Sequence, residues 1–148
     1  FSAHSDEVAL ALMDAFDFDS VLFPLNWVNY LEADFGPSVV EKAASKGMSR
    51  LALKALARGR IPKGYDRPYD RCWYEPVNDP ELAKLALRFT LSQPITAAIP
   101  PGDPGLFEMA VKLAQDFTPV EDSEIAFLRD RAAGVTPLAS SDWLTPAR

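Results

Sequence analysis

The chain has few of the residues that build metal sites and disulfides. Its 148 residues include one cysteine, Cys72, and one histidine, His4. A single cysteine cannot form a disulfide within the chain. One cysteine and one distant histidine also fall short of the ligand set of a zinc site. Covalent or metal cross-links are therefore not expected to hold this fold together.

Long apolar runs and an excess of positive charge are also missing. No run approaches the about 18 apolar residues of a membrane-spanning helix, and no signal peptide is recognisable. The 21 acidic residues outnumber the 15 basic ones, for a net charge of −6, which disfavours nucleic acids and anionic membranes as partners. We expect neither partner, and a cytoplasmic location. The chain begins at Phe1 without a methionine, so we also expect that the native N-terminus is missing.

Apolar residues make up 48% of the chain, enough for the core of one domain. The clearest local pattern lies at 94–117. There the short apolar segment Ile95–Ile99 predicts a buried strand that stops at Pro100. Asp103 is a good helix N-cap, and Pro104 suits the first helical position. A strand, tight turn and helix can direct backbone amides at a phosphate, but this stretch alone favours the plain alternative of an ordinary connection.

Similar patterns predict the remaining elements. We expect parallel, buried strands, adjacent in chain order, at Val21–Pro24, Arg50–Leu53 and Thr96–Ile99. We expect helices after Ser5, from Pro37 to Gly47, after Asp79-Pro80, after Asp103-Pro104, and at about Ser123–Ala133 before Gly134. Loops are expected at 27–36 and 60–76, and a loose tail from Val135.

Apolar spacing predicts which helix faces are buried. For the first helix these residues are Val8, Leu12, Met13 and Phe16. For the helix after Asp103 they are Phe107, Ala110, Val111, Ala114 and Phe117.

Short strands that are each followed by a helix predict right-handed parallel β/α units. A small parallel sheet of three strands would leave both of its edges unpaired. We therefore expect this chain to be part of a larger α/β protein.

The order of several segments resembles the C-terminal half of an aldo/keto reductase. The matching stretches are FSAHS (1–5), VLFPLN (21–26), GMSRLALKAL (47–56), LALRFTLSQPITAAIPPG (85–102) and the final helices. The resemblance covers the chain to about Pro137. It implies an α/β chain that forms the C-terminal portion, roughly strands six to eight with their helices, of a (β/α)8 TIM barrel. In this division, residues 1–138 belong to the barrel and 139–148 form a flexible tail.

The resemblance also implies a function. Members of this family transfer hydride between a nicotinamide cofactor and a small carbonyl substrate, using an Asp, Tyr, Lys and His set. That set lies on the first four strands, upstream of Phe1, so this chain would supply the cofactor-binding side. The expected cofactor-binding residues are Ser2, Asn26, Lys54, Pro100 and Gly102, with Asn26 presenting its side-chain amide towards the pocket and Gly102 its backbone amide. Ser2 matches the serine that binds the carboxamide, and Lys54 matches a position near the pyrophosphate.

Several matching positions depart from the family pattern. Where the family usually has an asparagine and a glutamine that bind the carboxamide, this chain has Ala3 and Leu22. The aromatic residue that often stacks on the nicotinamide is replaced by Leu53. In the family, a basic residue, a hydroxyl and a helical arginine commonly bind the adenosine 2′-phosphate. Here these positions hold Pro101, Gly102 and Phe107, none of which can do so with its side chain, so NAD(H) is favoured among the NAD(P)(H) cofactors. Two hypotheses follow: an NAD(P)(H)-dependent oxidoreductase, or a module that binds nicotinamide or regulates without turnover.

Other residues permit alternative interpretations. Lys54 is either a cofactor contact or a solvated strand end. His4 is interpreted as a surface or helix-capping residue. Tyr65, Tyr69 and Tyr74, near Lys63 and Asp66, resemble a catalytic trio but are interpreted as packing residues. Cys72 is expected to be a small buried thiol, and Trp73 to hold the 60–76 loop against the barrel mouth.

Overall fold

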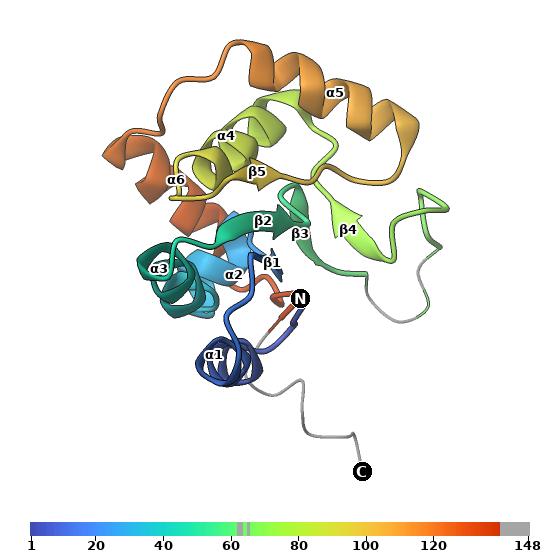
Figure 1. The fold of residues 1–148 in the computed structure, drawn as a ribbon. Coiled ribbons are helices and arrows are strands. Elements are labelled where there is room, and N and C mark those ends of the chain that lie inside the picture. Colours follow the sequence, from blue (N-terminus) through green and yellow to red (C-terminus); the bar gives the residue numbers. More distant parts are fainter. Residues whose placement is uncertain (62–63, 65, 140–148) are drawn as a thin grey trace.

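The structure, a computed structural model, describes residues 1–61, 64 and 66–139. Over these residues it is a mixed α/β fold with small sheets that do not close into a barrel (Figure 1). The elements are α1 (Asp6–Ala15), β1 (Ser20–Pro24), α2 (Trp27–Glu32), α3 (Pro37–Ser45), β2 (Ser49–Leu53), β3 (Ala57–Arg60), β4 (Tyr74–Pro76), α4 (Pro80–Leu91), β5 (Ala97–Ala98), α5 (Pro104–Gln115) and α6 (Asp122–Ala132). The predicted portion of a TIM barrel stays a prediction.

The three predicted strands form one parallel sheet. Its order is β1-β2-β5, and both pairings are parallel, so the predicted order and direction are confirmed. Hydrogen bonds extend the β5 pairing on both sides, from Thr96 N to Arg50 O and from Ile99 N to Ala52 O, each at 2.8 Å. The expected burial is wrong for β5, because Ala97 is exposed and Ala98 only half-buried, and in β2 it holds only for Ala52. The sheet neighbour β2 flanks this strand on one side only.

The two faces of this sheet differ in burial. Side chains alternate between faces along a strand, so Val21 and Phe23 share one face with Ala52, the register partner of Phe23. All three are buried. The opposite face carries Leu22 and its partner Leu51, both half-buried, and then the exposed Ala97. The parallel sheet therefore has one covered face and one partly open face.

Residues 1–3 lie along the free edge of β1. Ser2 and Leu22 form a parallel bridge. Leu22 N donates to Phe1 O at 2.9 Å, and Ala3 N donates to Leu22 O at 3.2 Å. A fourth parallel segment therefore accompanies the sheet and brings the chain to His4 near the carboxyl end of β1.

The predicted helix starts are confirmed by their caps. The side chains of Ser5, Asp79 and Asp103 accept hydrogen bonds from the amides of Val8, Leu82 and Leu106. Each bond satisfies a first-turn amide that has no partner within its own helix. The last helix is also confirmed, with α6 ending just before Gly134, whose φ is 76°.

Three elements among the described residues were not predicted: the helix α2 and the strands β3 and β4. The expected aromatic loop at 27–36 contains α2, because Asn26 Oδ1 accepts from Asn29 N at 2.9 Å and caps a helix. The expected loop at 60–76 contributes to an antiparallel pair, in which β3 joins β4. Lys63 and Tyr65, two members of the supposed catalytic trio, lie outside the described residues.

The predicted helix faces are partly wrong. In α1, Met13 is buried as predicted, but Val8 and Phe16 are 41% and 63% exposed, and Ala9 is buried instead. For the helix after Asp103, Ala110 is buried as predicted, but the predicted Phe107, Val111, Ala114 and Phe117 are exposed, and Leu106 is buried instead. Apolar spacing predicts a broad apolar stripe along a helix. In these two helices only part of that stripe is buried, so some of the predicted residues are exposed.

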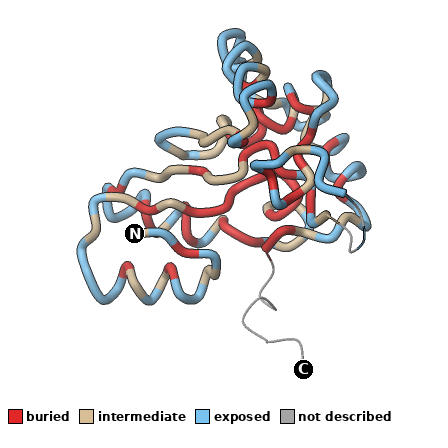
Figure 2. Tube along the Cα trace, turned by 90° about the vertical axis from the view of Figure 1, so that its right-hand side faces the viewer, coloured by how far each residue is buried: buried red, intermediate tan, exposed pale blue. Residues whose placement is uncertain are grey.

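The C-terminal segment packs back onto the fold. Leu138 and Ala139 are 2% and 4% exposed, and Leu138 N donates to the buried Asn29 Oδ1 at 3.0 Å. Figure 2 shows this buried end of the described chain beside the interior. The loose tail expected from Val135 is therefore wrong as far as Ala139, and the rest of the predicted tail lies outside the described residues.

Gly59 in β3 faces this C-terminal segment closely, which gives a first prediction. A Cβ added at Gly59 would lie 2.8 Å from Thr136 O and 3.0 Å from Val135 Cγ1. We expect Gly59→Ala to lower the free energy of unfolding by about 1–3 kcal/mol, because the backbone must shift. Urea unfolding measures this loss.

Gly102→Ala is the matched control for this prediction. Its added Cβ would meet Arg71 Cβ at an ordinary 3.5 Å. The control should change stability by less than about 0.5 kcal/mol. Equal unfolding midpoints for the two variants would contradict the packing of residues 135–136 on β3.

Candidate functional site

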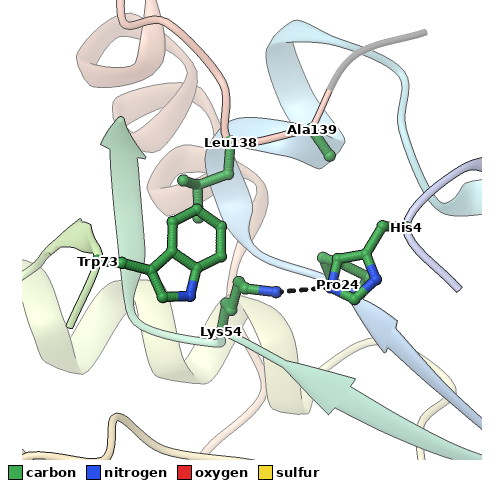
Figure 3. A pocket seen from close by; sticks show the side chains of 6 residues that line it. All are labelled: His4, Pro24, Lys54, Trp73, Leu138 and Ala139. Atoms are coloured by element: carbon green, nitrogen blue, oxygen red, sulfur yellow. Dashed lines mark hydrogen bonds between the residues drawn. The ribbon is translucent and has the colours of Figure 1, made fainter. Parts of the chain in front are cut away.

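Six side chains meet around a small cavity at the carboxyl ends of β1 and β2 (Figure 3). They are His4, Pro24, Lys54, Trp73, Leu138 and Ala139. Pro24 is the last residue of β1, and Lys54 directly follows β2. The cavity volume is about 10 Å³, room for about one water-sized group. The carboxyl ends of parallel strands are where α/β proteins place their sites.

Lys54 has an unusual backbone at this edge. Its φ is +59°, in the left-handed region that non-glycine residues occupy at a cost of about 1 kcal/mol. The turn is held by Ala57 N, which donates to Lys54 O at 2.9 Å, and by the fully buried Ala55 and Leu56 that follow. This conformation turns the chain sharply after β2 and fixes where the lysine side chain begins.

The Lys54 ammonium lies between an imidazole and an indole. Its Nζ is 3.1 Å from His4 Nε2 and 5.1 Å from the centre of the Trp73 ring. None of the salt bridges among the described residues includes Lys54. Burial lowers the pKa of Lys54 because it removes water from the charged form. Lys54 is thus a half-buried, partly desolvated cation at the end of a strand.

His4 is exposed as a residue, which agrees with its interpretation as a surface side chain. Its ring is nevertheless partly covered, and this burial lowers its pKa. The nearby charge of Lys54 lowers the pKa further. Both effects disfavour the imidazolium, so near neutral pH the ring is a neutral acceptor for the Lys54 ammonium.

The single histidine gives an unambiguous test of this contact. We expect His4 to titrate below the ordinary histidine pKa of 6.5, measured by NMR from its ring protons. In Lys54→Gln the pKa of His4 should rise only part of the way back, because burial is the larger cause. A pKa of His4 at or above 6.5 would contradict the geometry.

The cavity brings together only one of the five predicted cofactor residues, Lys54. Ser2 is exposed and lies two residues before His4, in the segment that bridges Leu22. Pro100 and Gly102 lie between β5 and α5, where Pro100 is half-buried and Gly102 is exposed. The cofactor roles of Ser2, Lys54, Pro100 and Gly102 stay predictions.

Asn26 does not fit its prediction. It was expected to present its amide towards a pocket, but its exposed fraction is 0% and its Oδ1 caps α2. Its Nδ2 is also buried. The helix that begins at Trp27 turns Asn26 inward, so this residue offers no exposed atom to a cofactor.

Sequence reasoning missed some residues near this edge. The contact of His4 with Lys54 joins residues 50 positions apart, which no local pattern indicates. Arg71 was also missed: its Cβ lies beside Gly102, so an exposed cation stands next to the connection before α5. The interpretation of Cys72 as a buried thiol is confirmed, and burial raises its pKa.

A second hollow lies between α4, β5 and α5. Its volume is about 130 Å³, and apolar residues line it: Leu87, Leu91, Ala98, Pro100, Ala110, Val111 and Ala114. No polar side chain on this lining could orient a ligand. Within the described ranges, no group of three or more His, Cys, Asp or Glu side chains could hold a metal ion. No helix among the described residues is long and apolar enough to cross a membrane.

Comparisons with known proteins give no match. No protein-family model matches the chain, and neither do curated proteins or solved structures. The function is therefore argued from the residues.

Proposed function

We propose that this chain is the cofactor-binding part of an aldo/keto reductase-like oxidoreductase that uses NAD(P)(H) to reduce a carbonyl to an alcohol. The proposal rests on the ordered sequence resemblance. One structural observation carries it further: the desolvated Lys54 lies at the carboxyl end of a parallel strand, beside the end of β1. The catalytic Asp, Tyr, Lys and His set would lie upstream of Phe1.

Lys54 is suited to one part of this task. A dinucleotide carries two negative charges on its pyrophosphate, and a lysine ammonium binds phosphate as a point charge. A salt bridge between Lys54 and a carboxylate would compete with that role. Among the described residues, no salt bridge includes Lys54. The N-terminus of α5, with the neighbouring Gly102, adds a second place where phosphate oxygens would be stabilised, although the amide of Leu106 already donates to Asp103 there.

A titration followed by tryptophan fluorescence tests the proposal. NADH or NADPH added to the chain should quench the emission in a saturable manner. Trp73 is 44% exposed and contacts Lys54, so Trp73→Phe should remove much of the quenching, whereas the fully buried Trp27 remains. Lys54→Gln should weaken binding about tenfold, since it removes a charged contact.

Lys84→Gln is the control, because Lys84 is an exposed lysine on α4, an element that contributes nothing to the cavity. Its affinity should equal that of the unmodified chain. Absence of saturable quenching, or equal losses for Lys54→Gln and Lys84→Gln, would overturn the proposal.

The alternative is a module that binds nicotinamide without turnover. The exchange of carboxamide-binding residues for Ala3 and Leu22 favours it, since neither side chain can donate a hydrogen bond. Hydride transfer measured on the longer protein distinguishes the two. Binding with turnover supports the oxidoreductase, and binding without turnover supports the module.

A further inference from the structure

The Lys54 amine differs in its surroundings from two other lysines of the chain. Lys42 and Lys46 are paired with the carboxylates of Asp14 and Asp17. Lys54 has an imidazole nitrogen at 3.1 Å and an aromatic face instead. Figure 3 shows its side chain reaching between Trp73 and His4.

This arrangement has the parts that a nucleophilic amine needs. A lysine becomes a nucleophile when desolvation or a nearby base removes its proton. Lys54 is partly desolvated, and His4 Nε2 is within hydrogen-bonding distance as a proton acceptor. The left-handed backbone at Lys54 fixes the start of the side chain, which limits the positions that the amine can take.

We propose that Lys54 forms an imine with a small aliphatic aldehyde, with His4 accepting the proton of the amine. The ligand class follows from the lining. Pro24, Leu138 and Ala139 give the cavity apolar walls, and its room for about one water-sized group admits only the carbonyl end of the aldehyde, so that a short alkyl chain lies outside it, beside the exposed Trp73. This inference goes beyond nicotinamide binding and does not depend on it.

The step balances as an ordinary condensation. His4 Nε2 takes a proton from the Lys54 ammonium, and the freed lone pair of Nζ attacks the aldehyde carbon. A C–N bond forms as the C=O π bond breaks, and the carbonyl oxygen takes one of the two protons left on Nζ to give a carbinolamine. The hydroxyl then leaves as water with a proton from His4, and the nitrogen is left as an iminium ion.

Trp73 fits the product of this step as well as the free lysine. An iminium ion keeps its positive charge on nitrogen, and the indole face attracts a cation at this distance. The imine would therefore retain the aromatic contact that the ammonium makes.

Reductive trapping tests the inference on the whole chain. Propanal and sodium cyanoborohydride are added at about pH 7, and the modified lysines are identified by peptide mass spectrometry. Cyanoborohydride supplies the hydride that converts each imine to a stable secondary amine. We expect Lys54 to be modified about tenfold faster than the exposed Lys84, because more of its amine is deprotonated. Equal rates at the two lysines would overturn the inference.

Two further samples separate local structure from intrinsic reactivity. In denaturant, the ratio of the rates at Lys54 and Lys84 should fall to about one, because every lysine is then solvated. In His4→Ala, modification of Lys54 should slow several-fold while Lys84 is unchanged. An unchanged rate at Lys54 in this variant would exclude His4 as the proton acceptor and overturn the proposal as stated.

The nicotinamide proposal can fail without this one. If the chain does not bind NADH but Lys54 is still modified faster than the other lysines, the proposed function is wrong and the imine site stands. If the chain binds NADH and all lysines are modified at equal rates, the proposed function stands and the imine site is wrong.

Discussion

Replacing Arg88 with methionine should lower the free energy of unfolding by about 3 kcal/mol, the largest stability loss that we expect from one charged residue here. Arg88 is 8% exposed, and its guanidinium makes a forked pair with Glu124, at 2.6 and 2.9 Å. It also donates to Thr118 O at 2.8 Å and to Pro119 O at 2.7 Å. One side chain thus ties α4 to the connection between α5 and α6.

Removing this arginine leaves several acceptors without their donor. Two backbone carbonyls and a carboxylate lose charged hydrogen bonds, and each loss is costly where water has poor access. Urea unfolding measures the effect. Arg58→Met is the matched control, because the pair of Arg58 with Glu75 is 3.1 Å long and exposed, and should contribute less than about 1 kcal/mol. Similar losses in both variants would contradict a special role for Arg88.

The same pair predicts a pH dependence. The hydrogen bond from Arg88 is the main cause that lowers the pKa of Glu124 below its ordinary value of 4.5. Because the pKa of Glu124 is lower in the folded state, this carboxylate is protonated at a higher pH in the unfolded chain than in the folded one. The stability from this pair is therefore complete above pH 4.5 and is lost as the pH falls through the folded pKa. The difference between the unmodified chain and Arg88→Met should shrink over that range.

The second large effect concerns the choice of cofactor. We expect the protein to bind NAD(H) at least as tightly as NADP(H). A 2′-phosphate is normally held by arginine or lysine, and the sequence has no basic residue between Arg88 and Lys112. Asp103 and Glu108 lie there instead. Asp103 Oδ1 accepts from Leu106 N at 3.0 Å, so its charge serves the helix cap and adds no attraction for phosphate.

The structure locates the residues that could oppose this preference. Arg58 and Arg60 follow β2, and Arg58 is paired with Glu75. Arg71 is a further candidate, because its Cβ lies beside Gly102 and the residue is exposed. Titration of both cofactors decides the matter. A tenfold preference for NADPH would contradict the prediction. If that preference disappeared in Arg71→Ala while NADH affinity stayed the same, Arg71 would be its cause.

Local chemistry made part of this fold predictable. The helix starts at Ser5, Asp79 and Asp103 were predicted, and in the structure each of these side chains caps its helix by accepting from an amide three residues away. The parallel strands followed from short apolar runs between helices. The helix α2 was missed because Trp27, Val28 and Tyr30 have weak helix propensity. Burial of its first residues and the Asn26 cap outweigh that propensity.

The site was less predictable because its contacts join distant parts of the chain. Lys54 could be chosen from its place at a strand end, but its contacts with His4 and Trp73 depend on the path of residues 1–4 and on the loop before β4. Asn26 was assigned wrongly because a residue just after a strand can equally begin the next helix. Arg71 became a candidate only because the fold places its Cβ beside Gly102.

Amide hydrogen exchange with and without saturating NADH tests the central claim most directly, since it shows where a dinucleotide lies. We predict slower exchange after β2, at residues 54–57, and at the start of α5, at residues 102–106, with no change in α3. Protection confined to other segments, or no protection at all, would contradict a cofactor site at the carboxyl ends of these strands.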